Sequence, residues 1–232
     1  MLQLRASDAR GQADFGWLKA RYSFSFNNYY DPKHMGFRAL RVINEDRVAA
    51  GKGFPTHSHN DMEILTYVLE GAIEHRDSLG SGEVLRPGEV QYMSAGTGVR
   101  HSEFNPSADA TLHLLQIWLE PNEIGAKPAY GQKRFPIAEE PDRLHLVASP
   151  DGRDGSIQIR SDAELLIGKL NAGTSLEHDL KMGHAWLQVV RGGVAAQGQQ
   201  LRAGDGLAIS DEAKLSIQAQ SDGAEILLFD LA

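Results

Sequence analysis

The chain of 232 residues contains no cysteine. This absence excludes disulfide bonds, thiolate metal ligands and a cysteine nucleophile, which leaves histidine and carboxylate as the strong candidates for any metal site. Long apolar runs are also missing. The N-terminal MLQLRASDARGQADFGW has no apolar core of a signal peptide, and no stretch approaches the roughly 18 apolar residues of a membrane helix. We therefore expect a soluble, cytoplasmic protein that does not contact a membrane.

Basic runs are absent as well. Lys and Arg number 23 against 31 Asp and Glu, which gives a formal charge of −8. Because an acidic surface repels a phosphate backbone, direct nucleic-acid binding is not expected. Hydrophobic residues make up 41% and charged residues 23% of the chain, a composition typical of a globular protein with an ordinary core.

Short segments rich in β-branched and aromatic residues recur between turn-forming residues. Examples are ALRVI, EILTYVLEG, GEVQYMS, LHLLQIWLEP, WLQVVRGGV, GLAIS and EILLFDL. This rhythm predicts an all-β protein of short antiparallel strands packed as sandwiches or barrels, with little helix. Segments such as SDAELLIGKL, residues 161–170, are the best candidates for one or two helical turns.

The distribution of proline divides the chain. Five of the nine prolines lie between Pro121 and Pro150, in a polar, glycine-containing stretch. The flanking parts also resemble each other, because LRPGEVQYMSAG (85–96) has an echo in LRAGDGLAISDE (201–212), and YVLEGAIEH (67–75) has one in QVVRGGVAA (188–196). We expect two tandem β domains of the same kind: residues 1–125, a connecting segment 126–150, and residues 151–232.

Two pairs of potential metal ligands lie in the first half. His57 and His59 are two residues apart in HSHNDME, and His101 and Glu103 have the same spacing in GTGVRHSEFN. On a β-strand, residues i and i+2 point to the same face, so facing strands would present three imidazoles and one carboxylate to a single point. That set suits an octahedral first-row metal with two positions left open.

The other histidines are interpreted as structural or exposed, on the view that none has a partner two residues further on. His113 in LHLLQIW is a partial exception, since strand alternation can point it toward the metal cavity. The second half offers His178 and His184 without the His-x-His spacing, so we expect the second domain to be metal-free. These remaining histidines are His34, His75, His113, His145, His178 and His184.

The spacing of glycine and histidine resembles the two cupin motifs. The first is represented by Gly51, His57, His59, Glu63 and Gly71, and the second by Gly96, Gly98, His101 and Asn105. The longer run GWLKARYSFSFNNYYDPKHMGFRALRVINEDRV, followed by THSHNDMEILTYVLEG and MSAGTGVRHSEFNPS, closely resembles the pirin family, and within it the bacterial pirin-like proteins with quercetinase activity.

The resemblance implies a bicupin of two jelly-roll barrels, with one metal, commonly Fe(II), in the first barrel. The ligands that it implies are His57, His59, His101 and Glu103. Other first-row metals remain open, and so does Glu63, the carboxylate position of ordinary cupins. Asn60 and Asp61 favour a turn before Glu63, so a position near the metal or on the surface is the expectation for Glu63. A monomer is expected, because the second domain can serve as an internal partner.

The function implied is that of a quercetin 2,3-dioxygenase, which opens a flavonol ring with O2 and releases CO. In this hypothesis Glu103 is both a ligand and the base that takes the proton of the substrate hydroxyl. One alternative is a metal-dependent redox sensor or regulator that acts through a protein partner. A sugar isomerase or epimerase is a further, weaker alternative, because the glutamate in the second motif is typical of pirins.

Overall fold

The computed structural model describes all 232 residues, and its strands form two compact units. One unit contains residues 11–135 and 159–161, and the other contains residues 1–10, 136–158 and 162–232. We call them the N-unit and the C-unit. Helix is limited to two 3₁₀ turns, η1 (Ser7–Ala9) and η2 (Arg153–Gly155). No helix has the length and apolar character needed to cross a bilayer.

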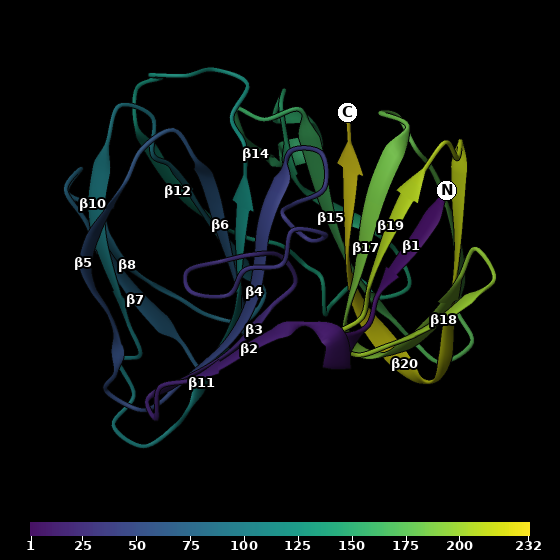
Figure 1. Cartoon of the computed structure of the whole chain (residues 1–232), viewed down its shortest axis with the longest axis horizontal. Helices are drawn as coiled ribbons and strands as arrows, with labels where there is room; N and C mark the ends of the chain where they lie inside the picture. Colours follow the sequence, from purple (N-terminus) through teal and green to yellow (C-terminus); the bar gives the residue numbers. More distant parts are fainter. The chain divides into compact units, whose positions relative to one another are not determined.

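The N-unit is built from two antiparallel sheets (Figure 1). A seven-stranded sheet has the order β12-β9-β6-β11-β4-β3-β2, and a four-stranded sheet has the order β5-β10-β7-β8. The bounds are β2 (Gly11–Asp14), β3 (Leu18–Tyr22), β4 (Leu40–Val48), β5 (Gly53–His59), β6 (Glu63–Glu70), β7 (Ile73–Asp77), β8 (Gly82–Leu85), β9 (Glu89–Ser94), β10 (Val99–Phe104), β11 (Leu112–Leu119) and β12 (Ala129–Arg134).

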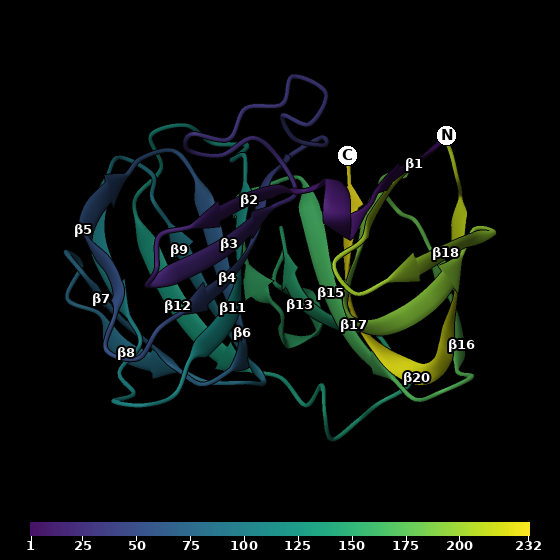
Figure 2. The ribbon, with the colours of Figure 1, turned by 60° about the horizontal axis from the view of Figure 1, so that its bottom comes forward.

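The C-unit repeats this arrangement with fewer, longer strands. Its path runs β1-β19-β17-β20-β15-β13-β14, with β16 paired to β20 and β18 paired to β17. Figure 2 shows β17 and β20 as long, bent strands. The bounds are β1 (Leu2–Arg5), β13 (His145–Ser149), β14 (Ile157–Gln158), β15 (Ala163–Leu170), β16 (Ser175–Asp179), β17 (His184–Ala196), β18 (Gln199–Arg202), β19 (Gly206–Ser210) and β20 (Lys214–Leu231).

The pairings of the two units correspond strand by strand. β17 pairs with β19 through its first half and with β18 through its second half, as β6 pairs with β9 and β7 with β8. β20 likewise corresponds to β10 and β11 joined into one strand. It pairs with β16 as β10 pairs with β5, and with β15 as β11 pairs with β4. The sequence echoes therefore reflect a repeated jelly-roll topology, and the all-β bicupin prediction is confirmed.

The expected domain limits differ from the units at two places. Residues 1–10 belong to the C-unit, because β1 pairs antiparallel with β19, with Leu2 opposite Ile209. β1 occupies the edge position that β12 occupies in the N-unit. The segment 126–150 carries strands β12 and β13, and the units divide after Phe135.

The helical turns expected in residues 161–170 are wrong, since this segment contains strand β15. β15 lies between β13 and β20, and seven of its eight residues are buried. A strand covered on both faces is apolar at nearly every position, so it lacks the alternation that identifies a half-exposed strand.

One face of the large N-unit sheet changes from apolar to polar along the strands. On β4 the successive residues of this face are Val48, Asp46, Asn44 and Val42. Val48 belongs to an apolar core cluster that also includes Ile73 and Leu85 of the four-stranded sheet. The cluster holds the two sheets together, and the polar positions beyond it leave room for a functional site.

Candidate metal centre

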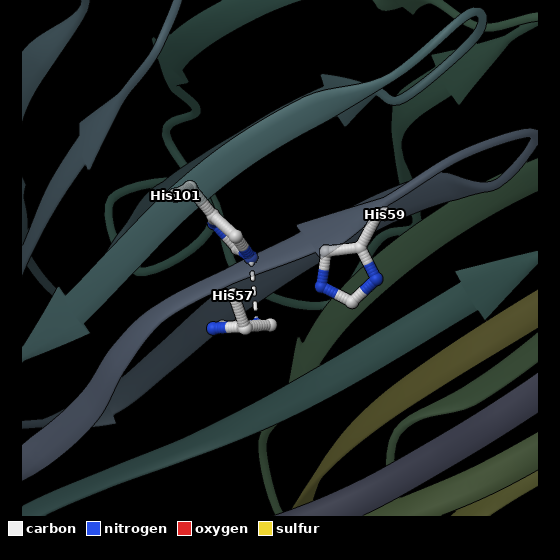
Figure 3. Close-up of side chains that lie close together, drawn as sticks. All are labelled: His57, His59 and His101. Atoms are coloured by element: carbon white, nitrogen blue, oxygen red, sulfur yellow. Dashed lines mark hydrogen bonds between the residues drawn. The ribbon is translucent and has the colours of Figure 1, made fainter.

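Three histidines converge between β5 and β10 of the N-unit. His57 lies directly opposite His101 in the antiparallel pairing, and His59 lies opposite Val99. Figure 3 shows the three imidazoles pointing toward one another, with His101 and His57 joined by a dashed line. One ligand nitrogen from each ring lies within 4.8 Å of the others. The His-x-His spacing on a strand thus places His57 and His59 beside His101, as expected for residues i and i+2.

Hydrogen bonds define which nitrogen of His57 carries its proton. Nδ1 of His57 lies 2.8 Å from the carbonyl oxygen of Pro55, so Nδ1–H donates to this oxygen. Nε2 of His57 then has a free lone pair. This atom faces Nε2 of His101 at 3.0 Å.

His101 is oriented from its other side by His75. Nε2 of His75 lies 3.0 Å from a carboxylate oxygen of Asp77, to which its N–H donates. Nδ1 of His75 is consequently an acceptor, and Nδ1 of His101 lies 3.4 Å from it. The chain Asp77–His75–His101 therefore places the proton of His101 on Nδ1 and a lone pair on Nε2.

The electrostatics of this cluster favour neutral imidazoles. Burial, together with the neighbouring histidines, lowers the pKa of His101 to about 2. Burial and the proximity of His57 lower the pKa of His59 to about 4. Neutral imidazole is the form that binds a metal.

Glu103 is buried on the same strand as His101. Its carboxylate forms a compact group with His75 and His101, and Nε2 of Gln116 donates to it at 3.2 Å. The pairing of β10 with β5 shifts register between His101 and Glu103, so that Glu103 lies opposite Phe54. Burial raises the pKa of Glu103 to about 7, although the hydrogen bond from Gln116 opposes this shift.

Glu63 is neither on the surface nor among these groups. It is buried, and its carboxylate accepts hydrogen bonds from the hydroxyls of Tyr92 and Ser94 and from the backbone N–H of Arg160 at 2.9 Å. His113 also points elsewhere, because its Nε2 lies 3.0 Å from Glu45 on the opposite face of the sheet from Asp46.

Sequence reasoning missed His75 and Asp77. The statement that no further histidine has a partner two residues on was wrong, since IEHRD repeats the His-x-carboxylate spacing. That spacing was the available signal, but only the pairing of β10 with both β5 and β7 shows that His75 meets His101.

A cavity of about 620 Å³ opens beside His57 and His59. Its walls are mainly aromatic and apolar, with a few polar groups, as in many small-molecule sites. The ring of Trp118 meets that of His59 edge-on at 4.9 Å and that of Phe26 at 5.3 Å. The lining also includes Phe15, Leu18, Tyr22, Asn27, Asn44, Asp46, Phe54 and Pro55.

The C-unit has different residues at the corresponding positions. Leu176 lies opposite Ile217 and His178 opposite Leu215, as His57 lies opposite His101 and His59 opposite Val99. Ile217, Leu215 and Ala219 belong to the apolar core of this unit. Of the three histidines only His59 has a histidine counterpart in the C-unit, His178, and this residue lies 3.7 Å from the buried carboxylate of Asp230.

Comparison with known proteins identifies the family of the chain. Residues 3–119 match the family described as Pirin, and residues 146–231 match the Quercetinase C-terminal cupin domain. A quercetin 2,3-dioxygenase of Escherichia coli K12 is 52% identical over all of this chain and 99% of its own length.

Two solved structures are similar throughout. YhhW from Escherichia coli has a TM-score of 0.96 at 51% identity, covering 100% of this chain and 98% of that chain. The bacterial pirin YhhW in complex with nickel(II) has a TM-score of 0.94 at 51% identity, covering 100% and 99%. With its two barrels, its histidine cluster and these full-length relatives, the chain belongs to the pirin family.

Proposed function

We propose that the N-unit binds one divalent metal ion through His57, His59, His101 and Glu103. The observation that carries this proposal is the 3.0 Å approach of two Nε2 atoms, on His57 and His101, whose protons are engaged on the opposite side of each ring. Two lone pairs at this distance repel each other unless a cation lies between them. Neutral imidazoles and a buried carboxylate are a donor set that suits first-row metals, and we propose Fe(II).

The reaction that we propose is cleavage of a flavonol by dioxygen with release of CO. The support comes from the aromatic cavity beside the histidines and from the dioxygenase named among the relatives. When bound, a divalent first-row metal supplies a Lewis acid with open positions at which a hydroxy-ketone and dioxygen can meet.

The protein's own residues would prepare the substrate for this reaction. The aromatic walls exclude water and bind a planar ring system. Glu103 is the group proposed to take the proton of the substrate hydroxyl, since it is a buried carboxylate near His101. Gln116 holds its carboxylate in place.

The test measures metal content and flavonol-dependent oxygen uptake on the same samples. We expect about one metal ion per chain in the wild type, and we expect His57→Ala to lose both metal and oxygen uptake. Glu103→Gln should retain the fold and lose turnover. A protein that contains metal but consumes no oxygen with flavonol would instead be a sensor or regulator, and a wild-type protein without metal would contradict the proposal.

A further inference from the structure

Three residues of the cavity lining each have one polar side-chain atom without a hydrogen-bond partner. The atoms are Oδ1 of Asn44, Oδ1 of Asp46 and Nε1 of Trp118, and each of these atoms is buried. Asn44 and Asp46 are 2% and 4% exposed. A buried polar atom without a partner destabilises a protein by about 1 to 3 kcal/mol, so three of them around one cavity require an explanation.

The neighbouring strands do not supply the missing partners. Asn44 and Asp46 are two residues apart on β4 and therefore share a face. Gln116, which lies opposite Asn44 on β11, is engaged with Thr66 and Glu103. The pairing partner of Asp46 is Leu114, whose side chain has no polar atom.

The unpartnered atoms form a complementary set. The oxygens of Asn44 and Asp46 can accept hydrogen bonds, and the indole N–H of Trp118 can only donate one. A ligand that satisfies all three presents hydroxyl donors toward β4 and an oxygen acceptor toward β11. Its body must be planar or apolar, because the rest of this wall includes Phe26 and Phe54.

We propose that Asp46 and Asn44 determine substrate specificity by accepting hydrogen bonds from ligand hydroxyls, while Trp118 donates to a ligand oxygen. The inference rests on the proposed function and narrows its substrate class. The preferred flavonols are those that carry hydroxyl groups in addition to the 3-hydroxy-4-keto pair shared by all flavonols.

The experiment compares two probes that both contain this 3-hydroxy-4-keto pair. Quercetin carries additional ring hydroxyls, and 3-hydroxyflavone has none. Their dissociation constants are measured without oxygen on the metal-loaded wild type and on Asp46→Val. We expect the wild type to prefer quercetin and the preference to fall roughly tenfold in Asp46→Val, the effect of one lost buried hydrogen bond.

Thermal unfolding of the ligand-free variants gives a second readout. Asp46→Val removes a buried carboxyl whose Oδ1 has no hydrogen-bond partner and introduces a residue that favours strands, so its melting temperature should be at least that of the wild type. A residue with a purely structural role would show the opposite change. Glu45→Val is the matched control, since it removes a carboxylate from the other face of β4 and should leave the preference between the probes intact.

The outcomes separate this inference from the proposed function. If Asp46→Val does not fold, Asn44→Leu tests the second acceptor by the same ratio of dissociation constants. An undiminished preference for quercetin in the folded variants would overturn the inference while leaving flavonol binding in place. A wild type that binds neither probe would overturn the proposed function and the inference together.

Discussion

The carboxylate of Glu63 accepts a hydrogen bond from the backbone N–H of Arg160, a residue 97 positions further along the chain. Through this bond the short segment 159–161 is attached to the N-unit, although the residues on either side of it belong to the C-unit. Arg160 adds a bond from its side chain to the carbonyl of Lys127 at 2.9 Å. The carboxylate of Glu63 therefore anchors a segment that is distant in the sequence.

Glu63→Gln should therefore reduce stability without reducing metal content. The glutamine amide has only one oxygen, so its NH2 group would face one of the N–H or O–H donors that the carboxylate now accepts. We expect a loss of about 1 to 3 kcal/mol in the free energy of unfolding, measured by urea titration. Loss of metal at unchanged stability would instead identify Glu63 as a ligand.

Strand periodicity is a local property, and from it the sequence predicted that His57 and His59 point the same way. In the structure both meet His101, whereas Glu103 groups with His75 and His101. His57 and His59 share a face whatever the rest of the chain does. The partners of Glu63 could not be predicted, because Tyr92, Ser94 and Arg160 meet it only through strand pairing and a long connection.

The polar residues of the cavity could not be predicted from the sequence either. Asn44 and Asp46 in RVINEDRV are two polar residues with strand spacing, and this pattern alone is typical of a solvent-exposed face. The fold nevertheless buries both residues, a property that depends on tertiary packing. For β15, by contrast, the apolar pattern was visible in the sequence, but a short buried run does not distinguish strand from helix.

Asp77→Asn should weaken metal binding, because it changes which nitrogen of His75, and in turn of His101, carries the proton. Oδ1 of Asp77 accepts hydrogen bonds from the backbone of Leu79 and Ser81, so an asparagine would keep its oxygen there and turn its NH2 group toward His75. The protons of His75 and His101 would then have to shift, and Nε2 of His101 would lose its lone pair. We expect metal affinity to fall by about 10- to 100-fold in a competition with a coloured chelator.

Glu74→Gln is the control for this variant. Glu74 lies on the same strand, and its partner is the exposed Arg76. Equal metal affinities for Asp77→Asn and the wild type would contradict the proposed orientation of His101.

Removal of the metal should destabilise one unit selectively. A ligand that binds only the folded state raises the free energy of unfolding by about 4 kcal/mol when its concentration is about 1,000 times the dissociation constant. In calorimetry, a chelator should lower the melting temperature of the N-unit and leave that of the C-unit unchanged. Trp186 is the only tryptophan of the C-unit. His57→Ala should show no response to chelator, and a chelator-sensitive C-unit would contradict the assignment of the metal to the N-unit.

Asp230 should make the C-unit sensitive to acid. Burial alone would raise its pKa, but the imidazole of His178, 3.7 Å away, and hydrogen bonds from the backbone N–H groups of Lys181 and Met182 hold the pKa below its ordinary value. Ionised Asp230 therefore contributes its full stabilisation of the C-unit above its pKa in the unfolded chain, about 3.9. This stabilisation is lost as the pH falls through the lower pKa of the folded state.

Asp230→Asn should lower the free energy of unfolding of the C-unit by about 1 to 3 kcal/mol at neutral pH. The variant should also lose less stability than the wild type as the pH falls. The measurement is urea unfolding of the C-unit at several pH values, followed by Trp186 fluorescence. An acid dependence as steep as that of the wild type would show that other carboxylates are responsible.

The pairing of β1 with β19 has a consequence for synthesis and engineering of the chain. Strand β1 is synthesised more than 200 residues before its pairing partner, since Leu2 pairs with Ile209. A fragment that starts at residue 151 would leave β19 as an open edge, available to pair with another chain. Expression of the C-unit alone therefore calls for a circularly permuted design, in which residues 1–10 follow Ala232 through a flexible linker.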